Sequence, residues 1–140
     1  MKYPGWTEGK IMKEALFYHK DVGHLLLVMN RDLSPYFEGF VGFPPGEDFL
    51  IISEDVPEHY RAPMLIHEII KQKLPDEEGR SICALQKETN YVIVEDFMNY
   101  RLYRLDFFER LVAWALTMAG EQELAVEAQS CVEYLREQSD

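Results

Sequence analysis

Apolar residues follow two different spacings along this 140-residue chain. Before residue 54 they form short runs, such as residues 24–29 and 49–53, bounded by turn-forming Gly, Pro and Asn. Runs of this kind are typical of buried strands. From residue 59 onward apolar residues recur every three or four positions, which is the spacing of amphipathic helices. We therefore predict an α+β fold, with a small antiparallel sheet at about residues 24–53 packed against four or five helices.

Two structures fit the segment before residue 24. In the first, Thr7 caps a helix whose apolar positions between residues 11 and 16 recur at helical spacing. In the second, Phe17-Tyr18 pairs with residues 24–29 in a hairpin, through the turn at residues 20–23. A further hairpin is predicted between residues 38–43 and 49–53, because Pro44-Pro45-Gly46 makes a firm turn.

The central helix is predicted at residues 59–73. Its apolar side chains occupy one arc of the helical wheel, while Glu68 and Lys71 lie on the opposite arc and His67 lies at the edge of that arc. Pro63 has no amide hydrogen to donate back to His59, so the helix either kinks or restarts there.

Three further helices are expected after Pro75. In the first, residues 77–89, Glu88 shares a face with small or apolar residues and can therefore point inward. Residues 90–94 have strand propensity, but their place between two helical patterns favours continuation of the helix. The last two helices, residues 100–119 and 121–138, should pack as an antiparallel hairpin, with Gly120 placed to end the first. Their expected inward positions are Leu102, Leu105, Phe108, Leu111, Val112, Ala115 and Leu116, followed by Leu124, Ala128, Cys131, Val132 and Leu135.

Charge limits the classes of partner. The chain has 14 Lys and Arg against 25 Asp and Glu, giving a formal net charge of -11, which repels phosphate backbones and anionic lipids. We expect no nucleic-acid partner and no membrane association. Cys83 and Cys131 are too few for a disulfide framework or a four-thiolate zinc site. The absence of a signal-peptide pattern and of an uncharged apolar stretch indicates a cytoplasmic protein, and the length fits a single domain over residues 1–140.

Residues 49–61, followed by Leu65-Ile66-His67-Glu68, resemble the strand, acidic turn and active-site helix of small zincin-like metalloproteases. In that family a His-Glu-x-x-His helix supplies two zinc ligands and a general base, and in the gluzin branch a downstream glutamate completes the zinc site. The resemblance implies His67 as a zinc ligand, Glu68 as the general base and Glu88 as the downstream ligand. Lys71 stands where the second histidine would be.

The substitution by Lys71 changes what the resemblance implies. Lysine binds zinc only as the neutral amine, and its usual pKa near 10.4 makes that form scarce at neutral pH. Unless His59 or another group completes the site, the zinc position is lost. The ammonium of Lys71 can instead pair with Glu68 or Glu88 and replace the missing cation. We therefore expect a zincin-like protein without protease activity or cofactor, acting by binding or as a structural component.

Two other functions stay open. One is an active zinc-dependent hydrolase that uses His67, Glu68 and Glu88. The other is an acidic interaction module that binds a protein partner, or a second copy of itself, through the helical hairpin at residues 100–138. An apolar stripe left exposed after the core is filled would favour this third function. Tyr100, Arg101, Tyr103 and Arg104 form an aromatic-basic run, in which helical spacing favours packed aromatics and solvated arginines over an RNA site.

Overall fold

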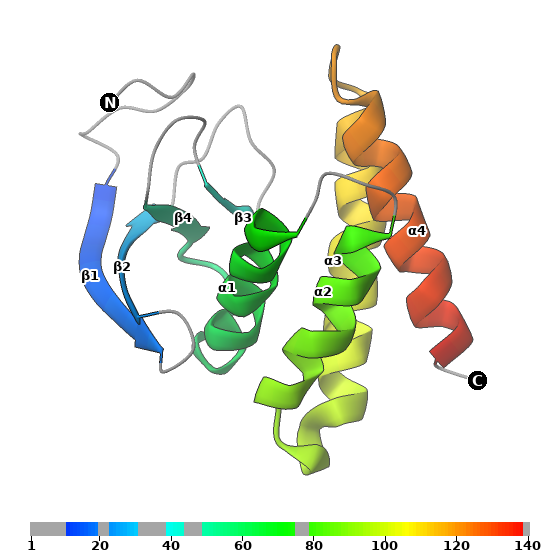
Figure 1. Cartoon of the computed structure of the whole chain (residues 1–140). Coiled ribbons are helices and arrows are strands. Elements are labelled where there is room, and N and C mark those ends of the chain that lie inside the picture. The colour runs from blue at the N-terminus through cyan, green and yellow to red at the C-terminus, as the bar shows by residue number, and fades with distance from the viewer. Residues whose placement is uncertain (1–10, 20–22, 31–38, 44–48, 75–78, 139–140) are drawn as a thin grey trace. The chain divides into compact units, whose positions relative to one another are not determined.

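The computed structural model describes residues 11–19, 23–30, 39–43, 49–74 and 79–138 (Figure 1). The chain divides into two compact units, Met1–Ile69 and Ile70–Asp140, which are described separately. The first unit contains the sheet and most of the first helix, and the second is helical. The predicted α+β class is confirmed.

The sheet has four strands, and it begins earlier in the chain than predicted. Strand β1 (Ile11–His19) pairs antiparallel with β2 (Gly23–Asn30), with Phe17 opposite Leu25 and Tyr18 opposite His24. The hairpin alternative for this segment is therefore confirmed, and the helix capped by Thr7 is wrong because its predicted core, residues 11–16, lies in β1. The apolar residues of this segment fit helical spacing as well as strand spacing, because β1 is too short for periodicity to distinguish a helix from a strand.

The sheet is mixed, whereas a purely antiparallel sheet was predicted. Strand β3 (Val41–Gly42) pairs antiparallel with β4 (Leu50–Ser53), which confirms the second hairpin. Strand β4 also runs parallel to β2, so the strand order is β1-β2-β4-β3. All four residues of β4 are buried. A strand covered on both faces carries no polar alternation, which is why β4 is a continuous apolar run.

Helix α1 (Glu58–Lys73) continues through Pro63 without a break. Arg61, in the first turn of α1, holds the preceding turn against the helix. Its side chain donates hydrogen bonds to the carbonyls of Glu54 and Val56, both at 3.0 Å. Buried apolar side chains on α1 recur at helical spacing in the unit that contains the sheet: Tyr60, Met64, Leu65, Ile66 and Ile69.

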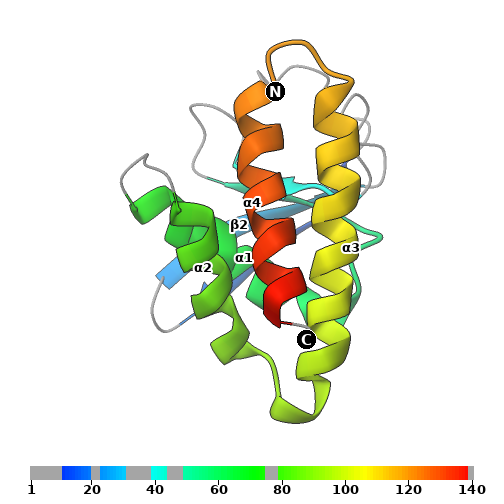
Figure 2. The same cartoon turned by 90° about the vertical axis from the view of Figure 1, so that its right-hand side faces the viewer.

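The second unit holds helices α2 (Arg80–Glu88), α3 (Phe97–Leu116) and α4 (Gln122–Gln138). Two 3-10 turns, η2 (Thr89–Tyr91) and η3 (Val94–Asp96), join α2 to α3, so residues 90–94 form neither the strand nor the continued α-helix that was considered. Helices α3 and α4 run antiparallel side by side, with α2 beside them, which confirms the predicted hairpin (Figure 2). Gly120, with φ of 84°, lies in the loop between them.

The core of this unit differs from the prediction at one position on α4 and more widely on α3. On α4, Ala128, Cys131, Val132 and Leu135 are buried as expected, whereas Leu124 is partly exposed and Ala125 is buried. On α3 the predicted broad face divides into two, because Leu102 and Leu116 are exposed. The residues that α3 buries are Tyr100, Arg104, Phe107, Phe108, Leu111 and Ala115.

Candidate functional site

The residues implied by the zincin resemblance lie on two helices and in both units. His59, His67, Glu68 and Lys71 are on α1, and Glu88 is the last residue of α2. His59 is exposed, whereas His67 is buried, with 2% of its surface accessible. Glu68 is partly exposed. His67 and Glu68 belong to the first unit, and Lys71 and Glu88 belong to the second.

Glu88 lies at the centre of a buried polar cluster. As predicted, it shares a buried face of α2 with Ser81, Ala84 and Leu85. Its Oε1 accepts a hydrogen bond from Arg104 Nη2 at 3.0 Å, and its Oε2 accepts one from the hydroxyl of Tyr100. The side chains of Glu88 and Arg104 are 0% and 1% exposed. A buried charge must be paired, and here the carboxylate and guanidinium neutralise each other away from solvent.

Two phenylalanines complete the surroundings of Arg104. Its guanidinium carbon lies 4.7 Å from the ring centre of Phe107 and 4.5 Å from that of Phe108, so each ring faces the cation. Such contacts replace part of the hydration that the guanidinium loses on burial. The expectation of a solvated Arg104 is wrong. Tyr100 and Arg104 lie four residues apart, which places both side chains on the inner face of α3.

The cluster changes the chemistry of Tyr100. Burial, and then the negative charge of Glu88, raise the pKa of Tyr100 well above the usual 10.0. At neutral pH the phenol therefore stays protonated and donates a hydrogen bond to Glu88. Burial also raises the pKa of the Cys131 thiol, which contacts Ser81 Oγ at 3.3 Å.

Lys71 has a partner that the sequence did not indicate. Its Nζ forms an ion pair and hydrogen bond with Glu127 Oε1 on α4. Glu127 Oε2 lies 3.6 Å from Arg80 Nε, so this carboxylate joins the end of α1, the start of α2 and the middle of α4. The contact shows that the Lys71 ammonium supports helix packing within the second unit.

Glu88 does not suit the role of a zinc ligand. Both of its carboxylate oxygens accept hydrogen bonds, one of them from a cation, and a second cation at the same oxygens would be repelled by Arg104. Among the residues that the structure describes, there is no group of three or more His, Cys, Asp or Glu side chains placed to hold a metal ion. The sequence found Glu88 but not its partners, because Arg104 lies sixteen residues further along the chain.

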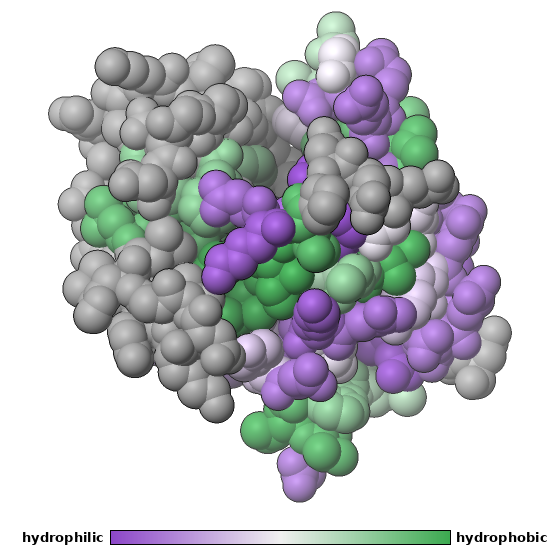
Figure 3. Space-filling view, in the orientation of Figure 1, coloured by the Kyte–Doolittle hydropathy of each residue, from purple (hydrophilic) through white to green (hydrophobic). Residues whose placement is uncertain are grey.

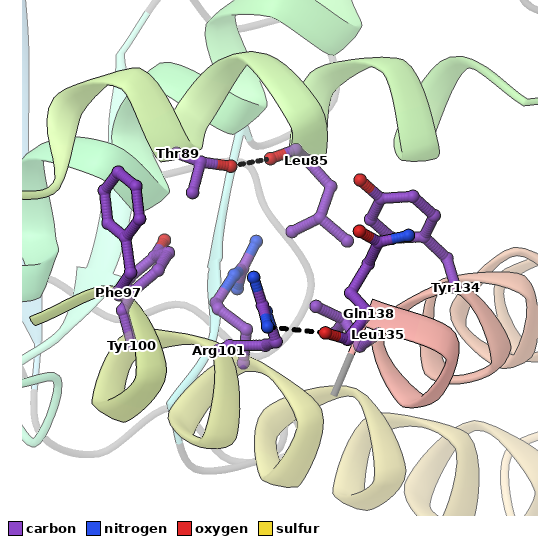
Figure 4. Close-up of a pocket in the computed structure, with 9 residues that line it drawn as sticks. Leu85, Thr89, Phe97, Tyr100, Arg101, Tyr134, Leu135 and Gln138 are labelled. Atoms are coloured by element: carbon purple, nitrogen blue, oxygen red, sulfur yellow. Dashed lines mark hydrogen bonds between the residues drawn. The ribbon is translucent and has the colours of Figure 1, made fainter. Parts of the chain in front are cut away.

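A small pocket lies where the three helices of this unit meet (Figure 4). Its walls include Leu85 and Thr89 from α2 and its C-terminal turn, Arg101 from α3 and Tyr134 from α4. Arg101 donates a hydrogen bond of 2.6 Å to the carbonyl of Gln138, and both residues line the pocket (Figure 4). The volume of about 50 Å³ suits a few water molecules, whereas pockets for organic ligands are typically about 300 Å³ or larger.

A larger feature of the second unit is an apolar surface on the side of α3 opposite its buried face. We name it the outer stripe. Its apolar side chains lie four, three, seven and four residues apart, with Glu109 within the seven-residue interval, and all are exposed or partly exposed: Met98, Leu102, Leu105, Val112 and Leu116. Of these, Met98 is 54%, Leu102 51% and Leu116 71% exposed.

The apolar surface extends beyond the start of α3. Ile93 and Val94, between and within the 3-10 turns, are 70% and 72% exposed, and Tyr91 is 37% exposed. Apolar residues gather at this end of the helical unit in the space-filling view (Figure 3). Scattered single apolar residues are normal on a protein surface, whereas apolar residues gathered along one face of a helix, here with Glu109 among them, are typical of interaction sites.

No family model, curated protein or solved structure matches the chain. The geometry of the described residues is therefore the basis for assigning a function. Among these residues, no helix combines the length and the apolar composition that a membrane span requires.

Proposed function

We propose that this protein acts by binding another protein through the outer stripe of α3. The observation that carries the proposal is the pair of apolar faces on a single helix. One face, which includes Phe107, Phe108 and Leu111, fills the core of the helical unit, and the outer stripe is left over. This is the feature expected of the interaction module that the sequence left open.

The cost of leaving the stripe in water supports this proposal. Fully burying one Leu or Met side chain contributes roughly 1.5–3 kcal/mol, and at least half of this contribution is absent while Met98, Leu102 and Leu116 are 54%, 51% and 71% exposed. Polar residues at these positions would favour solubility more than apolar ones do. The exposed apolar residues are accounted for if a partner covers them.

The zinc hydrolase is the weaker alternative. It requires Glu88 as a metal ligand, whereas the carboxylate of Glu88 is engaged by Arg104 and Tyr100. The likeness to zincin-like proteins stays a prediction of the sequence, and so does the role of His67 and Glu68 in it. Binding without catalysis agrees with the loss of the second histidine at Lys71.

The proposal is tested by replacing two leucines of the stripe, Leu102→Gln with Leu116→Gln, and comparing the result with Val126→Gln. Val126 on α4 is 69% exposed and lies outside the stripe, so it controls for the replacement of an exposed apolar residue by Gln. Two readouts are needed: self-association by sedimentation equilibrium, and binding of a synthetic helix that has Leu at heptad positions a and d and uncharged flanks. We expect the double variant to lower the association by more than about tenfold, because two buried leucines are lost.

The same proteins should unfold at closely similar temperatures, since surface changes alter stability by only about 0.5 kcal/mol. The proposal is wrong if wild-type protein neither self-associates nor binds the synthetic helix. It is also wrong if the double variant and Val126→Gln bind equally well.

A further inference from the structure

The charges around the outer stripe indicate which kind of helix covers it. We propose that the partner is an amphipathic helix with basic residues beside its apolar seam. This inference rests on the proposed function, and it adds the chemistry of the partner. It is carried by three observations: the spacing of the stripe, the acidic side chains along its edges, and the place of Glu109 within it.

The spacing favours a helix as the occupant. Intervals of four, three, four, three and four residues connect Met98 to Leu116 through Glu109, which is the a/d pattern of a coiled-coil seam. Side chains with this pattern insert between those of a second helix that runs alongside. A small ligand would need a concave site, whereas these residues follow the length of a convex helix.

The edges of the stripe carry more acid than base. Glu95 and Asp96 precede the helix, and Asp106 and Glu109 lie in its middle, at 68% and 46% exposure. These four carboxylates outnumber the three basic residues nearby. Arg110 Nε lies 3.0 Å from Asp106 Oδ2, Arg136 Nη2 lies 3.4 Å from Glu109 Oε2, and Arg101 donates to the carbonyl of Gln138. The stripe therefore presents an acidic edge to an approaching helix, and basic side chains on that helix are complementary to it.

Glu109 argues against a second copy of the chain as the occupant. In a parallel dimer Glu109 would face Glu109 of the other copy, and in an antiparallel dimer aligned over Met98–Leu116 it would face Leu105. Neither arrangement places a cation directly opposite the carboxylate, and each copy has a formal charge of -11. The present partner of Glu109 is Arg136, at 3.4 Å, with both side chains about half exposed, so a Lys or Arg from another helix can replace or join it.

The test uses two synthetic helices with the same Leu seam, one with Lys and one with Glu at the flanking positions and opposite Glu109. Their binding to the 140-residue chain is measured by fluorescence anisotropy at low and high salt. We expect the Lys helix to bind on the order of tenfold more tightly, with the difference falling as salt rises. Glu109→Lys should reduce this preference, whereas Glu133→Lys, an exposed α4 change with the same charge difference, should alter it less.

Several results would overturn the inference. Equal binding of the Lys and Glu helices contradicts it, as does an equal effect of Glu109→Lys and Glu133→Lys. Self-association that excludes both helices would identify a second copy as the occupant. In these cases the Leu102→Gln, Leu116→Gln variant shows whether the proposed function fails or only the inference of a basic partner. If that variant still abolishes association, the proposed function stands and only the basic partner is rejected.

Discussion

At the scale of single residues, the Glu88 cluster shows how a buried charge is held in this unit. Taking two ions out of water costs several kcal/mol each, and their attraction repays this only when the remaining hydrogen bonds are made. Tyr100 bonds to the second carboxylate oxygen, and the rings of Phe107 and Phe108 cover the guanidinium. Such a pair contributes little net stability but fixes which faces of α2 and α3 meet.

Single and double replacements within this cluster should have unequal costs. Arg104→Leu leaves Glu88 as an uncompensated buried charge and should lower the free energy of unfolding by about 3–5 kcal/mol. Adding Glu88→Leu should restore part of that loss. Urea denaturation measures each value, with Arg110→Leu as the exposed control, expected to cost less than about 1 kcal/mol. Similar losses for Arg104→Leu and Arg110→Leu would contradict the buried pair.

Tyr100 should make stability depend on pH in the alkaline range. Its folded pKa lies above its unfolded value near 10.0, so its contribution is complete below pH 10 and falls as the pH rises towards the folded pKa. Tyr100→Phe should cost about 1–3 kcal/mol at pH 8, through the lost hydrogen bond to Glu88. Above pH 10 the difference between the two proteins should shrink, by about 1.4 kcal/mol per pH unit at most.

Urea unfolding of both proteins at several pH values between 8 and 11 provides the measurement. Cys131, whose pKa is also raised by burial, is present in both proteins, so its effect cancels in the difference. A difference that stays constant over this range would show that Tyr100 does not titrate differently in the two states.

At the scale of elements, α3 explains why its sequence was difficult to interpret. Apolar residues surround much of the helix, so periodicity alone predicts one broad buried face that includes Leu102 and Leu116. The inner face is predicted only in part, because helical spacing favours a packed Tyr100 but a solvated Arg104. An inward carboxylate at Glu88 requires a buried cation on a neighbouring helix, and the sequence offered Lys71 for that role, whereas the structure gives Arg104.

The two faces of α3 should respond differently to the same change. Leu111→Ala removes a buried side chain and should destabilise the protein by about 2–5 kcal/mol. Leu102→Ala, at a position that is 51% exposed, should cost less than about 1 kcal/mol in the absence of a partner. Thermal or urea unfolding of the two variants makes the comparison. Equal losses would mean that Leu102 is packed within the folded chain.

At the scale of the whole molecule, the sequence predicts whether a segment is a helix or a strand better than it predicts which elements lie side by side. The α+β class, the strands around residues 24–53 and the helical hairpin follow from local spacing. The parallel contact of β2 with β4 and the pairing of Lys71 with Glu127 do not, because they join residues far apart in the chain. Periodicity tells which side of an element is buried, but it does not tell which element covers that side.

The strand order also sets a constraint on synthesis of the protein. Within the described residues, β3 pairs only with β4, and β4 in turn lies between β3 and β2. A growing chain that ends before residue 50 can therefore form the β1–β2 hairpin, but it has no place for β3. Until β4 leaves the ribosome, the inner edge of β2 presents unpaired backbone groups, which are open to pairing with another nascent chain.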